Sequence, residues 1–130
     1  MKVLIADDSK ILQERLLGLI EECEFVTGIE QVYTTLAAKD AVQSKKFDVI
    51  ISDIRMPGGG GFDLLEYIRR HYPKTKVILI TNYPYPQYSK KAKELGAEYF
   101  LSKSDELEEL VPVLEKIHHT FLKSIAASAG

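Results

Sequence analysis

Two hydrophobic patterns alternate along the chain. Short runs of consecutive apolar residues are typical of strands buried on both faces. Each run is followed by a segment in which apolar residues recur every three or four positions, as on one face of a helix. The alternation occurs five times and predicts five strand–helix units. The predicted strands span residues 3–6, 29–34, 49–52, 77–80 and 99–101, and the predicted helices span 12–23, 36–44, 62–68, 88–95 and 107–121.

Glycine and proline mark the limits of the later helices. Gly96 follows the fourth helical segment and is predicted to end it as a C-cap residue. Pro112 lies inside the fifth segment, where it cannot donate a helical hydrogen bond. The fifth helix is therefore predicted to start near Glu109, after a separate turn around Asp105.

Five consecutive strand–helix units predict an α/β fold, with a parallel sheet covered by helices on both faces in the doubly wound arrangement. Length and composition agree with this fold. A chain of 130 residues fits one core, and 45% hydrophobic with 28% charged residues is ordinary for a globular domain. We expect that domain at 1–123 and a frayed or artificial tail at 124–130.

Charge and cysteine content argue against several classes of function. A net charge of −2 argues against direct electrostatic binding of nucleic acid. No apolar run approaches the length of a membrane span, and the apolar start is too short for a signal peptide, so no membrane association is expected. Cys23 is the only cysteine, which excludes an internal disulfide and fits a reducing, cytoplasmic location.

Polar side chains follow four of the predicted strands. Because such folds bind ligands at the carboxyl ends of their strands, these side chains are the candidate site. Converging carboxylates repel one another, and a hard divalent cation such as Mg²⁺ would relieve the repulsion. An ammonium and a hydroxyl beside them suit phosphoryl transfer, with a carboxylate able to act as the acceptor. The residues are Asp7 and Asp8 after the first strand, Asp53 after the third, Thr81 after the fourth, and Ser102 and Lys103 after the fifth.

Each of these residues also has a purely structural explanation. Asp8 or Ser9 suits the N-cap of the first helix, and loop amides could satisfy Asp53. Thr81 could serve as a turn hydroxyl, and Lys103 could be a solvated charge. Their joint position at the ends of four strands favours a functional site over these separate explanations.

Four motifs lie at or beside the predicted strand ends: ADDS at 6–9, DIRMPGGGGFDLL at 53–65, ILIT at 78–81 and GAEYFLSKS at 96–104. With them, the chain from residue 2 to about 121 resembles the receiver domain of two-component response regulators, in the CheY-like superfamily. The resemblance implies a (βα)5 flavodoxin-like fold with strand order 2-1-3-4-5.

The resemblance also implies a metal-assisted acceptor site. Asp53 would be the phosphoacceptor and a metal ligand. Asp8 would bind Mg²⁺ directly, with Mn²⁺ as an alternative ion, and Asp7 would act through metal-bound water. The backbone carbonyl of Arg55 would complete the protein ligands.

A switch is implied as well. Lys103 and Thr81 would contact phosphoryl oxygens, and Phe100 would be the switch aromatic that turns inward as Thr81 moves. A sensor histidine kinase or a phosphotransfer protein would donate the phosphoryl group. The surface of the fourth helix, fifth strand and fifth helix would change, and it is also where a homodimer would form. A downstream protein, or an output domain outside this chain, would read the change.

Two stretches depart from the family pattern. Gly59 and Gly60 stand where the family usually has side chains, which should loosen the loop after the third strand. The segment NYPYPQY at 82–88 is either a stiffened loop packed on the fourth helix or a docking surface for a partner. Within it, Tyr83 is expected to act with Arg55 to screen the phosphorus and slow hydrolysis.

Three functions from different classes compete. The favoured one is a signalling receiver module that is not a metabolic enzyme. A Mg²⁺-dependent phosphatase of the haloacid dehalogenase type also uses Asp, Thr or Ser, and Lys at strand ends. Its nucleophile lies on the first strand in an Asp-x-Asp motif, which the DDSK stretch here lacks. A pure interaction module that has lost phosphorylation is disfavoured by the intact set of acidic, hydroxyl and amine side chains.

Overall fold

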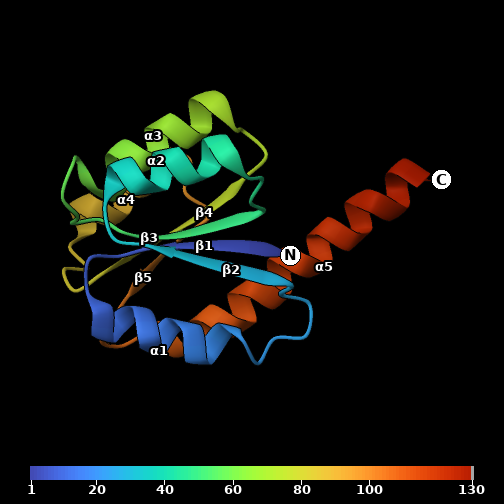
Figure 1. The fold of residues 1–130 in the computed structure, drawn as a ribbon, viewed down its shortest axis with the longest axis horizontal. Helices are drawn as coiled ribbons and strands as arrows, with labels where there is room; N and C mark the ends of the chain where they lie inside the picture. The colour runs from blue at the N-terminus through green and yellow to red at the C-terminus, as the bar shows by residue number, and fades with distance from the viewer. Residues whose placement is uncertain (130) are drawn as a thin grey trace.

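The computed structural model describes residues 1–129 and confirms the α/β fold. Five parallel strands form one sheet in the order β2-β1-β3-β4-β5. Helices α2, α3 and α4 cover one face of the sheet, and α1 and α5 cover the other (Figure 1). The elements are β1 (Lys2–Ala6), α1 (Lys10–Ile20), β2 (Gly28–Val32), α2 (Thr35–Ser44), β3 (Val49–Asp53), α3 (Gly60–His71), β4 (Lys76–Thr81), α4 (Pro86–Glu94), β5 (Tyr99–Ser102), the 3-10 turn η1 (Leu107–Glu109) and α5 (Leu110–Ala129).

Alternate residues of each strand pack into two cores, one on each face of the sheet. In β1, Leu4 and Ala6 belong to the core beneath α2, α3 and α4. Val3 and Ile5 belong to the core beneath α1 and α5, and all four side chains are fully buried. With both faces covered, polar groups can gather where the strands end.

Both helix limits marked by glycine and proline are confirmed. Gly96 has a φ of +92° and follows α4, where the Ala97 amide donates to the Ala92 carbonyl at 2.9 Å. The 3-10 turn at Leu107–Glu109 precedes α5 as a separate element. Pro112 lies in the first turn of α5, where its missing amide removes no helical hydrogen bond.

Two elements, α1 and β2, end at least two residues earlier than predicted. Helix α1 ends at Ile20, so Cys23 is buried in the turn that follows rather than on the helix. Strand β2 ends at Val32, because Thr34 leaves the sheet to cap α2. The Thr34 hydroxyl accepts a hydrogen bond from the Ala37 amide at 3.0 Å.

The fifth helix is longer than predicted. Instead of fraying after residue 123, α5 continues to Ala129 and extends beyond the sheet (Figure 1). Its last residues are rich in alanine, the strongest helix former, and they prolong a helix already nucleated on the core. Phe121, predicted to lie on the apolar stripe, is 47% exposed. The domain boundary at residue 123 stays a prediction. No helix among the described residues has the length and hydropathy needed to span a membrane.

Candidate functional site

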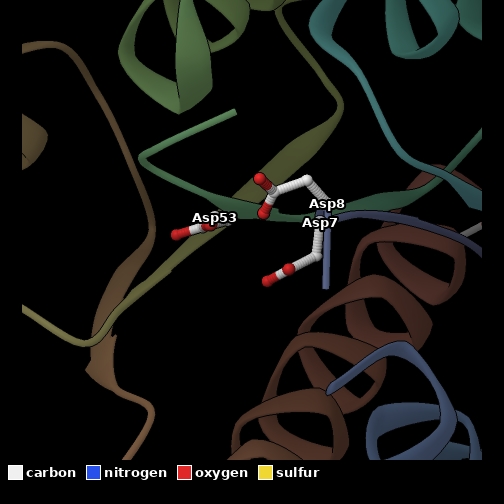
Figure 2. Close-up of side chains that lie close together, drawn as sticks. All are labelled: Asp7, Asp8 and Asp53. Atoms are coloured by element: carbon white, nitrogen blue, oxygen red, sulfur yellow. The ribbon is translucent and has the colours of Figure 1, made fainter. Parts of the chain in front are cut away.

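Three carboxylates meet at the carboxyl edge of the sheet, as the sequence predicts. Asp7 and Asp8 follow β1, and Asp53 is the last residue of β3, the strand that pairs with β1. Each offers one oxygen, and these oxygens lie within 4.8 Å of one another. Figure 2 shows the three side chains extending from neighbouring strand ends. Asp7 and Asp53 are buried, whereas Asp8 is exposed.

The predicted lysine joins this cluster. Lys103 follows β5, and its side chain is 8% exposed. Its Nζ lies 2.8 Å from Asp7 Oδ2 and 3.2 Å from Asp53 Oδ2. The ammonium therefore bridges the two buried carboxylates, and a purely solvated role for Lys103 is excluded.

The electrostatics of the cluster suit a divalent cation. Burial raises the pKa of the Asp53 carboxyl, and the Asp7 charge raises it further. Lys103 and the Arg55 backbone amide oppose that rise in pKa. When all groups are ionised, three carboxylates and one ammonium sum to a formal charge of −2.

Within the described residues, one buried oxygen of the cluster lacks a hydrogen bond. Asp7 Oδ1 accepts from the Ser9 amide at 2.8 Å, but the buried Asp7 Oδ2 has no geometrically satisfactory hydrogen bond despite its ion pair with Lys103. A buried polar atom without such a partner is unusual in a folded protein. The excess negative charge and this oxygen together fit a hard, oxygen-binding cation such as Mg²⁺.

Thr81 occupies the neighbouring strand end. Ile80 pairs with Asp53, and Thr81 is the next and last residue of β4. Its side chain is fully buried, and its hydroxyl accepts a hydrogen bond from the Tyr83 amide at 2.9 Å. In this structure Thr81 is therefore a turn hydroxyl at the edge of the acidic cluster. The Lys103 amide, which donates to the Thr81 carbonyl at 2.8 Å, ties the β4 and β5 ends together.

The glycine loop is more constrained than predicted. Gly58, Gly59 and Gly60 all have positive φ, a region that L side chains rarely adopt. A Cβ on Gly60 would lie 2.3 Å from the Ile54 carbonyl oxygen. The glycines allow α3 to start against the end of β3, so the expectation that they loosen this loop is corrected.

Arg55 and Tyr83 lie together beside the acidic cluster. The Arg55 guanidinium carbon is 4.1 Å from the centre of the Tyr83 ring, a cation–π contact. Arg55 Nη2 also lies 3.5 Å from the Tyr88 hydroxyl on α4, at the outer limit of a hydrogen bond. Tyr85 joins the group through ring contacts with Tyr83 and Tyr88. Tyr83 and Tyr85 are exposed and Tyr88 is half-buried, so the loop combines packing on α4 with an open surface.

Phe100 does not join the acidic cluster. It is half-buried on β5, pairs with Leu79 of β4, and packs against the core beneath α2, α3 and α4.

Sequence reasoning missed two polar residues that support the site. Thr35, fully buried at the start of α2, accepts a hydrogen bond from the Gly60 amide at 2.9 Å. Gln13 of α1 is 1% exposed and donates to backbone carbonyls at the ends of β1 and β2. The sequence does indicate that Gln13 is buried. It lies three residues before Leu16 and seven before Ile20, which places it on the buried face of the helix.

Comparison with known proteins decides the family. Residues 3–115 match the family model described as the response regulator receiver domain. The chain belongs to this family. It is thus a receiver domain of two-component response regulators, a signalling module rather than a metabolic one, and its Asp7, Asp8 and Asp53 form an acidic pocket.

Relatives of this receiver domain include longer regulators. The response regulator FleR of Pseudomonas aeruginosa is 33% identical over 117 residues, which cover 88% of this chain and 24% of FleR. The sensory transduction protein LytT of Enterococcus faecalis is 30% identical over 116 residues, which cover 89% of this chain and 47% of LytT. The chain spans between 32% and 58% of the length of three such relatives.

Solved receiver structures share the fold along most of this chain. The isolated receiver domain of RcsB from Salmonella enterica, solved with phosphomimetic BeF3⁻, gives a TM-score of 0.81 at 28% identity and covers 89% of this chain and 88% of that one. Chemotaxis protein CheY4 of Vibrio cholerae gives a TM-score of 0.79 at 28% identity, covering 89% of this chain and 97% of that one. These matches confirm the flavodoxin-like fold with strand order 2-1-3-4-5.

Proposed function

We propose that Asp53 accepts a phosphoryl group from a histidine kinase or phosphotransfer protein in a Mg²⁺-dependent reaction. The observation that carries the proposal is the position of Asp53, buried among two other carboxylates and the Lys103 ammonium. A carboxylate oxygen of Asp53 attacks the phosphorus of the donor's phosphohistidine. The new O–P bond forms as the P–N bond breaks, and the electron pair of that bond stays on the leaving imidazole nitrogen.

The acidic residues have separate roles in binding the metal. Asp8 and Asp53 would supply direct carboxylate ligands, the backbone carbonyl of Arg55 would supply a third, and Asp7 would act through water bound to the ion. Mn²⁺ has the same preference for oxygen ligands and is the alternative ion. When bound, the cation neutralises charge that develops on the transferring phosphoryl oxygens.

Lys103 and Thr81 position the phosphoryl group. Lys103 already lies within 3.2 Å of an Asp53 oxygen, so its ammonium is placed to pair with a phosphoryl oxygen on that side chain. The Thr81 hydroxyl holds the Tyr83 amide in this structure. Its oxygen accepts that bond, so the hydroxyl hydrogen is free to be donated to a phosphoryl oxygen, and movement toward the phosphoryl group would exchange the Tyr83 amide for this new partner.

That exchange at Thr81 links phosphorylation to the surface. As Thr81 moves, Phe100 turns inward, and the α4–β5–α5 surface changes between two populated states. A downstream protein, or an output domain outside this chain, reads that surface. The same surface serves a homodimer, and this chain makes no direct contact with nucleic acid.

Arg55 and Tyr83 control the lifetime of the aspartyl phosphate. Their side chains are in cation–π contact, and the two together would act as a lid over phosphorylated Asp53. The lid limits the approach of the water that hydrolyses the O–P bond and regenerates the carboxylate. This self-hydrolysis is the only turnover proposed for the domain.

The rim of the site supports docking of a protein donor. Ile11 and Leu36, in the first turns of α1 and α2, are 82% and 66% exposed. Because α1 and α2 begin shortly after the carboxyl ends of β1 and β2, both residues lie at the edge of the sheet that carries the acidic cluster, where exposed apolar side chains suit a docking surface.

The test is the intact mass of the protein after incubation with acetyl phosphate, with and without Mg²⁺, for wild type and Asp53→Asn. We expect a Mg²⁺-dependent gain of one phosphoryl group that Asp53→Asn lacks. Consumption of acetyl phosphate without an adduct, even after rapid trapping, would favour the phosphatase. No adduct and no consumption would favour the interaction module.

A further inference from the structure

A buried glutamine connects the two strand ends beside the acidic cluster. Gln13 Nε2 donates to the carbonyls of Ile5 and Asp7 at 3.2 and 3.1 Å, both at the end of β1. It also donates to the Val32 carbonyl at the end of β2, at 2.7 Å. The two hydrogens of one side-chain amide from α1 are thus shared among three backbone acceptors at the ends of two parallel strands.

A second glutamine fixes the orientation of that amide. Gln31 of β2 donates from Nε2 to Gln13 Oε1 and to the Gln13 carbonyl, each at 3.0 Å. Because Gln13 Oε1 accepts from Gln31, the NH₂ group of Gln13 must face the strand carbonyls.

The backbone of Asp7 is held from several directions as a result. Its carbonyl accepts from Gln13, and its amide donates to the Val32 carbonyl at 3.1 Å. Its side chain accepts from the Ser9 amide, and the Ser9 hydroxyl caps α1 by accepting from Leu12. The turn that carries Asp7 and Asp8 is therefore tied both to the sheet and to the helix.

We propose that Gln13 is a positioning residue for the metal site. Its amide holds the β1–α1 turn in place, so the Asp7 and Asp8 carboxylates stay together although they repel each other. The inference rests on the proposed Mg²⁺ site. It adds a buried residue that contacts neither metal nor phosphoryl group and acts through the backbone of its ligands.

The test compares metal affinity in folded variants. Gln13→Met keeps the length of the side chain but removes its donors. We expect it to weaken Mn²⁺ binding, followed by electron paramagnetic resonance, and Mg²⁺ binding, followed by calorimetry, by about tenfold. Gln31→Met leaves Gln13 in place but removes its anchor, so we expect a smaller loss of roughly threefold. The control is Gln43→Met, because Gln43 is exposed and bonds only the Tyr67 hydroxyl.

A kinetic readout separates positioning from general damage. Phosphorylation of Gln13→Met by acetyl phosphate should need about tenfold more Mg²⁺ for half-maximal rate, yet approach the wild-type rate at saturating Mg²⁺. A disrupted fold would lower the saturated rate instead. If Gln13→Met does not fold, Gln31→Met carries the same test.

The outcomes distinguish the inference from the proposed function. Wild-type metal affinity in folded Gln13→Met, or in Gln31→Met where only that variant folds, would overturn the inference and leave the proposed site standing. A lowered saturated rate with unchanged metal affinity would also overturn it. Absence of saturable metal binding by the wild type would overturn both.

Discussion

The two sides of the acidic site are held by different kinds of interaction. On the β1 side, hydrogen bonds from Gln13 and Ser9 fix Asp7 at its backbone and side chain. On the β4 side, Thr81 leads into an exposed segment in which the Tyr83 backbone is hydrogen-bonded, whereas the Tyr83 side chain contacts a neighbouring ring and a guanidinium. Hydrogen bonds are directional, whereas ring contacts tolerate sliding. The side of the proposed metal site is thus held in one geometry, whereas the side of the proposed switch can take more than one.

Removing the bridging ammonium should have the largest effect, because Lys103 forms ion pairs with both Asp7 on the β1 side and Asp53. Lys103→Met leaves Asp7 and Asp53 buried without their common partner. We expect it to lower the free energy of unfolding by about 3 kcal/mol without metal. Saturating Mg²⁺ should restore part of the loss, since the cation supplies positive charge at the same carboxylates. Urea denaturation with EDTA and with Mg²⁺ measures both effects.

The control for this prediction is a lysine pair on the surface. Lys39 lies 2.8 Å from Asp63, with side chains 26% and 45% exposed. Lys39→Met should cost less than about 1 kcal/mol and should not respond to Mg²⁺. Equal losses in the two variants would contradict a special role for Lys103.

Neutralising Asp53 should stabilise the metal-free protein, by less than Lys103→Met destabilises it. The folded pKa of Asp53 is raised above the ordinary value of 3.8, chiefly by burial. The protonated Asp53 carboxyl therefore contributes its full share to the free energy of unfolding below pH 3.8. That share is lost as the pH rises through the folded pKa and the buried carboxyl ionises. The side chain in Asp53→Asn does not ionise, so the variant keeps this stability. Its melting temperature in EDTA should therefore exceed that of wild type at pH 7. The difference should shrink as the pH falls toward 3.8.

Magnesium provides the check on that prediction. Wild type should gain more stability from Mg²⁺ than Asp53→Asn, because the variant lacks one ligand charge. A wild type that melts above Asp53→Asn at pH 7 in EDTA would show that burial does not dominate at this carboxyl.

Changes on the switching side should have the smallest effect. Tyr83→Ala removes the ring beneath Arg55, so water should reach phospho-Asp53 more easily. We expect its lifetime to shorten roughly threefold, about 0.7 kcal/mol of barrier, measured by loss of the phosphoryl mass with time. Tyr85→Ala is the matched control, because Tyr85 is an exposed tyrosine of the same segment whose ring contacts Tyr83 and Tyr88 rather than the Arg55 guanidinium, so its loss should leave the lifetime nearly unchanged. An unchanged lifetime in Tyr83→Ala would show that Tyr83 does not screen phospho-Asp53 from water.

The sequence predicts the strand ends of this protein well, for a physical reason. Buried parallel strands are short apolar runs, so the polar residues that come directly after each run mark the edge of the sheet. This rule places Asp7, Asp53 and Lys103 together without knowledge of their distances. Phe100 and Tyr83 were assigned from family resemblance, and their functional roles stay predictions.

Supporting residues escape such local rules because their partners lie far along the chain. Gln13 contacts Val32 and Gln31, and a helical pattern marks it only as a polar residue on an apolar face. Gly60 looks permissive in sequence, but in the structure its bare Cα lets α3 approach the end of β3. Thr35, which holds the Gly60 amide, gives no sequence signal beyond its place at the start of a helix.

The length of α5 means that a small rotation at one end of the helix becomes a larger displacement at the other. Its 20 residues give a rod of about 28 Å from Leu110 to Ala129 at 1.5 Å per residue. A tilt of about 5° at the end that rests on the core then displaces the far end by about 2.5 Å. A flexible tail would absorb such a movement within a few residues, whereas a continuous helix carries it as rotation and translation to its last turn.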